Sequence, residues 1–129
     1  MIPDLLLTSL DVVRLARVLH KRPDTAFAER LELAAVVPSE RIAPDVITMN
    51  SRIVLGTLPA GDDRVVTLVY PDHGVISSEF VSVLSPLGRV LLGARCGDEV
   101  HATLPDGRER RFLIRRLEYQ PEAAGDWHV

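Results

Sequence analysis

The sequence predicts an α+β fold in which a short antiparallel helical hairpin, a coiled-coil arm, precedes an antiparallel sheet with one packed helix. Apolar residues recur at helical spacing in the first third of the 129-residue chain, whereas they alternate with polar residues from residue 46 onward. Within the alternating part, Ser85-Pro86 forms a strong helix start, because serine caps helices and proline suits the first turn. We therefore expect an arm with its linker over residues 1–44 and a sheet domain over residues 45–129.

The first predicted helix follows Thr8, which has the spacing of a capping box with Asp11. Asp11, Arg14 and Lys21 are expected on the solvent-exposed side of this helix. Pro23 ends the pattern, because proline lacks the amide hydrogen that a helix needs, and it marks the tip of the hairpin. The apolar side is a stripe at helical spacing, made of Val12, Leu15, Ala16 and Leu19.

The second predicted helix is capped by Asp24 or Thr25, whose side-chain oxygens can accept hydrogen bonds from the first turn. We expect its apolar stripe to pack against that of the first helix. Residues 38–44, bracketed by prolines, form the linker to the sheet. The stripe of the second helix consists of Phe27, Ala28, Leu31, Ala34 and Ala35.

Five strands are expected in the sheet domain: one that begins at residue 46, followed by residues 64–70, 79–84, 99–104 and 109–119. The dense Val and Leu content of residues 64–70 predicts burial on both faces. In the last strand the apolar residues change parity between Ile114 and Leu117, which predicts a β-bulge near Arg115. In the first strand, one face should carry Ile47, Met49, Ile53 and Leu55, and the other Thr48, Asn50 and Arg52.

Composition and charge limit the possible functions. The net charge of -3 argues against direct nucleic-acid binding, which needs an excess of basic residues. The lone Cys96 excludes an internal disulfide, and no apolar run reaches the roughly 20 residues of a membrane span. The four histidines are scattered, and motifs for a nucleophile or a phosphate loop are absent from the sequence. We expect a cytoplasmic, monomeric protein with no enzymatic activity, metal or cofactor.

Several motifs of the sheet domain carry a family resemblance. The main motif reads SPLGRVLLG over residues 85–93, CGDEV over residues 96–100 and YQPEAAGD over residues 119–126. Residues 46–53 (VITMNSRI) and 67–71 (TLVYP) agree with it. Together they resemble the C-terminal, FKBP-like domain of the bacterial Gre transcript-cleavage factors, and in particular the branch of regulators of nucleoside diphosphate kinase. The resemblance implies an FKBP-like domain that binds RNA polymerase.

The resemblance also implies a docking surface, which we define as Leu84, Ser85, Pro86 and Arg89. In Gre factors the matching Ser-Pro lies where the protein docks on the rim of the polymerase secondary channel. An acidic residue precedes it in those proteins, and Leu84 occupies that position here. The alternative is that Ser85 and Pro86 are simply a helix start that needs no partner.

The predicted tip of the arm departs from the Gre pattern. Gre factors carry a pair of acidic residues at the tip of a long coiled coil, where they help to hold a catalytic metal in the polymerase. Here the tip offers Asp24 alone, close to Lys21 and Arg22, and Asp24 also suits a helix cap. Helices of about 12 residues give an arm of only about 18 Å. We therefore expect competition with Gre factors without stimulation of transcript cleavage.

The last predicted hairpin is rich in arginine, with Arg108, Arg110 and Arg111 followed by Arg115 and Arg116. These side chains suit either a solvated sheet edge or an electrostatic contact with an acidic partner. The FKBP-like fold leaves two further functions open, a peptidyl-prolyl isomerase or a protein-binding module, although aromatic residues for an isomerase pocket are few. The family branch adds a direct or indirect effect on nucleoside diphosphate kinase.

Overall fold

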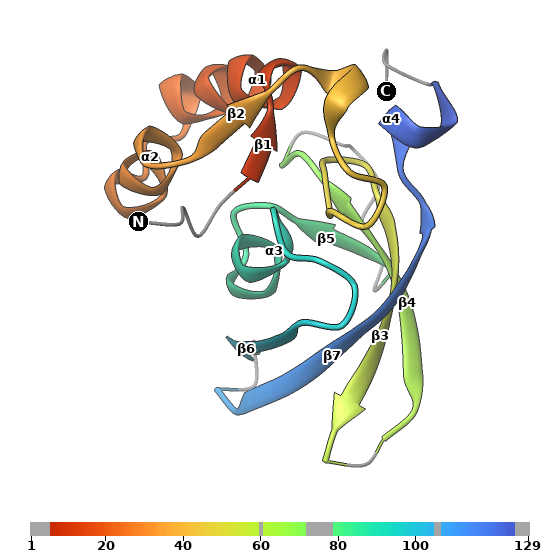
Figure 1. The fold of residues 1–129 in the computed structure, drawn as a ribbon. Helices are drawn as coiled ribbons and strands as arrows, with labels where there is room; N and C mark the ends of the chain where they lie inside the picture. The colour runs from red at the N-terminus through yellow and green to blue at the C-terminus, as the bar shows by residue number, and fades with distance from the viewer. Residues whose placement is uncertain (1–5, 60, 72–78, 105–106, 126–129) are drawn as a thin grey trace.

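The computed structural model describes residues 6–59, 61–71, 79–104 and 107–125, and it confirms the α+β class (Figure 1). The N-terminal part contains β1 (Leu6–Thr8), α1 (Ser9–Lys21), α2 (Thr25–Glu32), β2 (Ala35–Val37) and a 3-10 turn (Ser39–Arg41). The sheet contains β3 (Arg52–Leu58), β4 (Asp63–Val69), β5 (Phe80–Ser82), β6 (Glu99–Thr103) and β7 (Glu109–Tyr119). Two short helices complete the fold, α3 (Pro86–Leu91) within the curl of the sheet and α4 (Pro121–Ala124) after its last strand (Figure 1).

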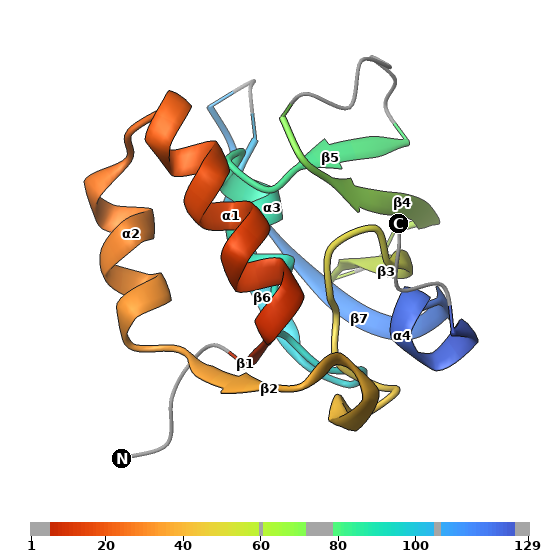
Figure 2. The same ribbon diagram turned by 90° about the horizontal axis from the view of Figure 1, so that it is seen from above.

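The arm is a helical hairpin whose base is closed by a small parallel ribbon. α1 and α2 lie side by side (Figure 2), and β1 pairs with β2 from Leu6↔Ala35 to Thr8↔Val37. The sequence did not predict this ribbon, because three-residue strands are too short to show a periodic pattern. α2 has eight residues rather than about 12, since residues 35–37 belong to β2.

The N-terminus of α1 confirms one half of the predicted capping box and corrects the other. The Thr8 hydroxyl accepts a hydrogen bond from the Asp11 amide at 3.1 Å. The prediction that Asp11 faces solvent is wrong, because its side chain is buried and accepts a hydrogen bond from the Met49 amide at 3.1 Å. Asp11 stands four residues before Leu15 and so lies on the same face of the helix. This spacing could have indicated from the sequence that Asp11 is buried.

The five-stranded sheet has the order β5-β4-β3-β7-β6. All neighbours pair antiparallel except β4 and β5, which run parallel, so the sheet is mixed and not antiparallel throughout as predicted. β4 is buried over its second half, whereas Val65 in its first half is exposed. The predicted burial of this strand on both faces therefore holds for only part of its length.

The predicted bulge in β7 is present. Val54 of β3 pairs with Arg116 while Leu55 pairs with Ile114, which leaves Arg115 as the extra residue. A second shift, which the sequence did not predict, follows near Glu118.

The bulge sends the Arg115 side chain across β3. Its Nε lies 2.7 Å from Oδ1 of Asp63 on β4. A Cβ at Gly56 would lie 2.5 Å from that Nε, so glycine leaves the space through which the guanidinium passes. The extra residue of β7 thereby forms an ion pair with β4, on the far side of β3.

Residues 46–51 form a loop rather than the start of a strand, and β3 begins at Arg52. Asn50 has a φ of 66°, a left-handed conformation that interrupts extended backbone. Ile47 and Met49 are buried as predicted, but Thr48 is buried as well and does not point to solvent. This loop, called the 46–51 loop below, lies between the arm and the sheet.

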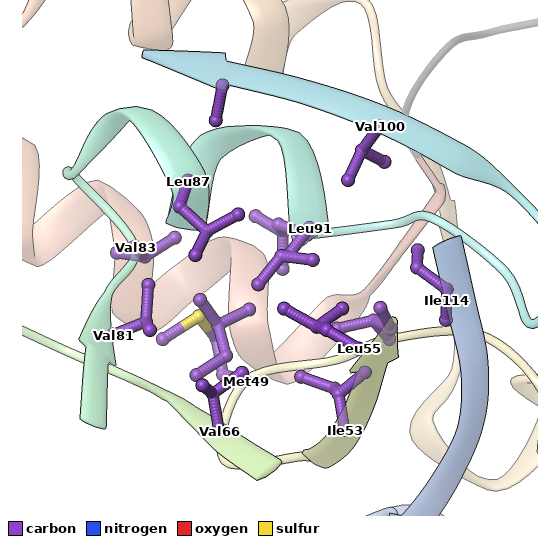
Figure 3. Close-up of a cluster of buried hydrophobic side chains, with 14 of the residues drawn as sticks. Met49, Ile53, Leu55, Val66, Val81, Val83, Leu87, Leu91, Val100 and Ile114 are labelled. Atoms are coloured by element: carbon purple, nitrogen blue, oxygen red, sulfur yellow. The ribbon is translucent and has the colours of Figure 1, made fainter. Parts of the chain in front are cut away.

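The core lies between α3 and the curled sheet. Figure 3 shows Leu87 and Leu91 of α3 directed toward Met49 of the 46–51 loop and toward Leu55 of β3. The same cluster of buried residues includes three side chains of the arm, Leu7, Leu15 and Phe27. The arm and the sheet domain therefore share one hydrophobic core.

A shared core predicts that a cavity in the arm weakens the whole protein. Phe27 is 1% exposed, so Phe27→Ala should lower the free energy of unfolding by about 3–5 kcal/mol. Val13→Ala, at a position 51% exposed on α1, is the control and should cost under about 1 kcal/mol. Denaturant unfolding followed by circular dichroism and by amide exchange should show one transition. Separate unfolding of the arm and the sheet would contradict the shared core.

Candidate functional site

The start of α3 is built as the sequence predicted. The Ser85 Oγ accepts a hydrogen bond from the Gly88 amide at 3.1 Å and donates one to the Ser82 carbonyl at 2.6 Å. Pro86 takes the first position of the helix and is exposed. A Cβ at Gly88 would lie 1.9 Å from the Ser82 carbonyl oxygen, so glycine allows α3 to approach the end of β5 closely.

A cavity of about 270 Å³ opens beside Ser85 and Pro86, between β5, α3 and the end of β6. Its lining is mainly apolar, and the polar residues in it are Arg64, Ser82, Ser85 and Thr103. The apolar part of the lining consists of Phe80, Val81, Pro86, Leu87 and Leu104. The exposed proline of the predicted docking surface thus borders an apolar hollow that can receive a side chain.

Arg89 connects α3 to the tip of the arm. Its Nη1 donates to Oδ1 of Asp24 at 3.2 Å, and its Nη2 donates to Oδ2 of the same carboxylate. Its Nε donates to the Leu84 carbonyl at 2.9 Å, and its guanidinium lies 5.7 Å from the centre of the Phe27 ring. A fork of this kind fixes both the distance and the orientation of the two charged groups.

Asp24 serves two structural roles in this arrangement. Its Oδ1 also accepts a hydrogen bond from the Phe27 amide at 3.1 Å, so it caps α2 as the sequence predicted. The Arg89 hydrogen bonds, and after them the Phe27 amide, hold the pKa of Asp24 below its usual value. Asp24 is therefore a carboxylate whose oxygens are already engaged by α2 and α3.

The structure thus brings together two predicted groups that are far apart in the sequence. Asp24 of the tip meets Arg89 of the docking surface, and Leu84 joins them through its carbonyl. Lys21 and Arg22 of the tip are exposed. A second tie runs from Arg30 of α2, whose Nη1 donates to the Arg89 carbonyl at 2.6 Å.

The arginines of the β6–β7 hairpin follow Leu104, which lines the cavity beside Ser85 and Pro86. Arg108 and Arg111 are exposed and Arg110 is partly buried. Arg111 pairs with Glu99 of β6 at 3.2 Å, so part of this positive charge is balanced by the neighbouring strand.

No physical role for residues 119–126 could be predicted from the sequence, and the structure supplies one for their first part. The Gln120 Nε2 donates to the carbonyls of Ala43 and Val46 at 2.8 and 2.7 Å. Glu122 accepts a hydrogen bond from the Thr48 hydroxyl at 2.6 Å. These residues hold the 46–51 loop against α4. Asp126, the last residue of the YQPEAAGD motif, lies outside the described residues.

We did not predict from the sequence that Asp11 of the arm is a buried carboxylate in contact with the 46–51 loop. Its Oδ2 accepts from the Met49 amide, and its Oδ1 accepts from the Tyr70 hydroxyl at 3.3 Å. Burial, with a smaller effect from the charge of Glu122, raises the pKa of Asp11 to about 6. Burial, with a smaller effect from the charge of Asp11, also raises the pKa of Tyr70 above its usual value.

In the described ranges 6–59, 61–71, 79–104 and 107–125, no three His, Cys, Asp or Glu side chains are grouped so that they could hold a metal ion. None of the helices described in this structure combines the length and the apolar character needed to cross a membrane.

Comparisons with known proteins agree with the motif resemblance. The family described as "Transcription elongation factor, GreA/GreB, C-term" matches residues 42–119. The chain is 39% identical to the "Regulator of nucleoside diphosphate kinase" of Escherichia coli (strain K12), over 97% of this chain and 96% of that protein. It is 32% identical to transcription elongation factor GreA of Desulfovibrio desulfuricans over 66% of this chain and 52% of that protein, about half the length of GreA.

A solved structure also supports the similarity to GreA/GreB factors. The structure titled "Prokaryotic transcription elongation factor GreA/GreB from Nitrosomonas europaea" matches with a TM-score of 0.79 and 34% identity, over 92% of this chain and 100% of that chain. The match therefore includes most of the arm as well as the sheet domain. The resemblance inferred from the motifs to the branch of regulators of nucleoside diphosphate kinase is confirmed.

The buried Asp11 predicts a specific dependence of stability on pH. Its pKa rises from 3.8 to about 6 on folding, so its contribution to stability is largest at low pH and is lost as the pH rises through 6. From Asp11 alone, the free energy of unfolding should fall by about 2 kcal/mol between pH 4.5 and pH 7.5. Asp11→Asn, which keeps an acceptor for Met49, should remove this difference in urea unfolding. The exposed Asp62→Asn is the control. Equal pH slopes for Asp11→Asn and the unmodified protein would contradict the prediction.

Proposed function

The chain belongs to the GreA/GreB family of transcription factors, and from this premise we propose that it is a non-enzymatic regulator that binds RNA polymerase. It docks near the secondary channel as a monomer in the cytoplasm and competes there with Gre factors. It does not stimulate transcript cleavage. The observation that carries the proposal is the combination of the family motif at the start of α3 with a short arm whose tip carboxylate is bound within the protein.

The docking part of the proposal is supported by the start of α3. Ser85 makes its hydrogen bonds within the protein, so it shapes the surface and leaves Pro86 exposed. The apolar cavity next to Pro86 gives this surface a recess for a side chain of the partner. Ser85 accordingly positions the helix, and Pro86 with the cavity makes the contact.

The absence of cleavage stimulation is supported by the arm. α1 has 13 residues and α2 has eight, so the hairpin reaches about 20 Å at most. Both oxygens of the Asp24 carboxylate accept hydrogen bonds from Arg89, so neither is presented as an open metal ligand. A divalent cation bound with substrate phosphates needs accessible oxygen ligands, and an occupied carboxylate is poorly suited to this role.

The docking helix yields a prediction about polymerase binding. Pro86→Glu keeps a residue that suits a helix N-terminus but places a charge beside the apolar cavity, so it should lower retention by core RNA polymerase at least about tenfold. Val36→Glu adds the same charge at an exposed position of β2 and serves as the matched control. Pull-down at low salt measures both. Failure of the unmodified protein to bind would overturn the proposal, and equal retention of both variants would overturn the assignment of Pro86.

The proposed competition predicts the outcome of a cleavage assay on stalled polymerase. Added alone, the protein should leave the transcript uncleaved at the background rate. Added with a Gre factor, it should slow cleavage in proportion to its concentration, because both occupy one surface. Stimulation by this protein alone would contradict the account of Asp24, and unchanged Gre-dependent cleavage would contradict the shared surface.

A second candidate function follows from the Escherichia coli relative, whose name is "Regulator of nucleoside diphosphate kinase". We propose that any effect of this chain on that kinase is exerted through transcription and not by direct contact. The purified kinase should then keep its activity when the protein is added in excess. A change in that activity would show a direct contact instead.

A further inference from the structure

We infer that Arg89 is a positioning residue: it fixes the tip of the arm on α3, so that the arm and the start of α3 meet RNA polymerase as one rigid surface. The family resemblance places Arg89 in the predicted docking surface. The choice of partner rests on the proposed function, whereas the internal role of Arg89 rests on its contacts in the structure.

The guanidinium of Arg89 is bound by groups of its own chain. Its Nε is engaged by the Leu84 carbonyl, and both Nη atoms are engaged by the Asp24 carboxylate. The Arg89 and Asp24 side chains are 30% and 23% exposed. Each of the three guanidinium nitrogens thus donates to a partner within the chain, and the fork on Asp24 fixes the orientation of the group.

Arg89 also sets the rotation of α2 and not merely its distance from α3. The fork holds the N-terminal end of α2 at Asp24, while Arg30 near the other end donates to the Arg89 carbonyl at 2.6 Å. The Phe27 ring lies between these two ties, beneath the guanidinium, and enters the core. The two hydrogen-bonded ties and the buried ring hold α2 at three positions along its length.

Because the arm is restrained, its tip and the start of α3 form one surface that a partner would contact. A projecting arm would present its tip at a distance from Ser85 and Pro86. Here Arg89 joins the tip to Leu84, the residue that precedes the start of α3. Polymerase that binds at Pro86 therefore meets the arm in a fixed place, and loss of Arg89 should weaken binding even though Arg89 itself makes no contact.

A double-mutant cycle tests this inference. Asp24→Asn keeps an acceptor that can cap α2 but removes the charge, and Arg89→Met keeps the stem of the side chain but removes the guanidinium. Each variant should raise, by roughly tenfold, the concentration needed to inhibit Gre-dependent cleavage by half. The double variant should show the same tenfold effect, because both substitutions break one ion pair. Arg89→Lys, which keeps the charge without the fork, should lie between these variants and the unmodified protein.

A control separates positioning from general stability. Ile114→Val removes one methylene from the core of β7, away from the arm, and should leave competition unchanged. Additive losses in the double variant would overturn the inference, since they would show that Arg89 acts independently of Asp24. Unchanged competition in both single variants would overturn it as well.

Amide exchange on the free protein tests the internal role without polymerase. Asp24→Asn and Arg89→Met should both speed exchange across α2, whereas Ile114→Val should not do so selectively. Unchanged exchange across α2 would overturn the inference even if competition is lost. If the unmodified protein fails to bind polymerase while α2 exchange still rises in the variants, the proposed function fails and the internal role of Arg89 stands.

Discussion

The fold depends on how the backbone of the 46–51 loop is held. The loop is irregular and buried, so its amides and carbonyls need partners from within the protein. The Ile47 amide bonds to the Ala94 carbonyl after α3, and the Asn50 amide bonds to Leu68 of β4. Asp11 and Gln120 reach the same loop from the arm and from the end of β7. Four parts of the chain are thus attached to one segment of six residues.

This arrangement explains why a costly group is kept in the core. Asp11 is destabilised by burial, yet it satisfies the Met49 amide, which an apolar residue at this position would leave without a partner. Its hydrogen bond also attaches α1 to the sheet domain through polar contacts in addition to the apolar contacts of Leu15 and Phe27. The arm is consequently part of the domain in both its packing and its hydrogen bonding.

Local features were predictable from the sequence, and contacts between distant segments were not. The caps at Thr8 and Ser85 and the bulge at Arg115 depend on residues a few positions apart, so the sequence indicates them directly. The parallel pairing of β4 with β5 depends on which distant segment lies alongside, and a periodic pattern carries no such information. In the candidate site, the residue types of the tip and of α3 were predicted, but their meeting through Arg89 required the structure.

The parallel β1–β2 ribbon has a consequence for how such proteins can diversify. The chain enters the arm through β1 and leaves it through the neighbouring β2, so helices of any matched length can be inserted between them without altering the sheet. Lengthening both helices, however, would carry the tip away from Arg89. An arm that extends further would therefore lose the contact between its tip and α3, and in this chain that contact is kept.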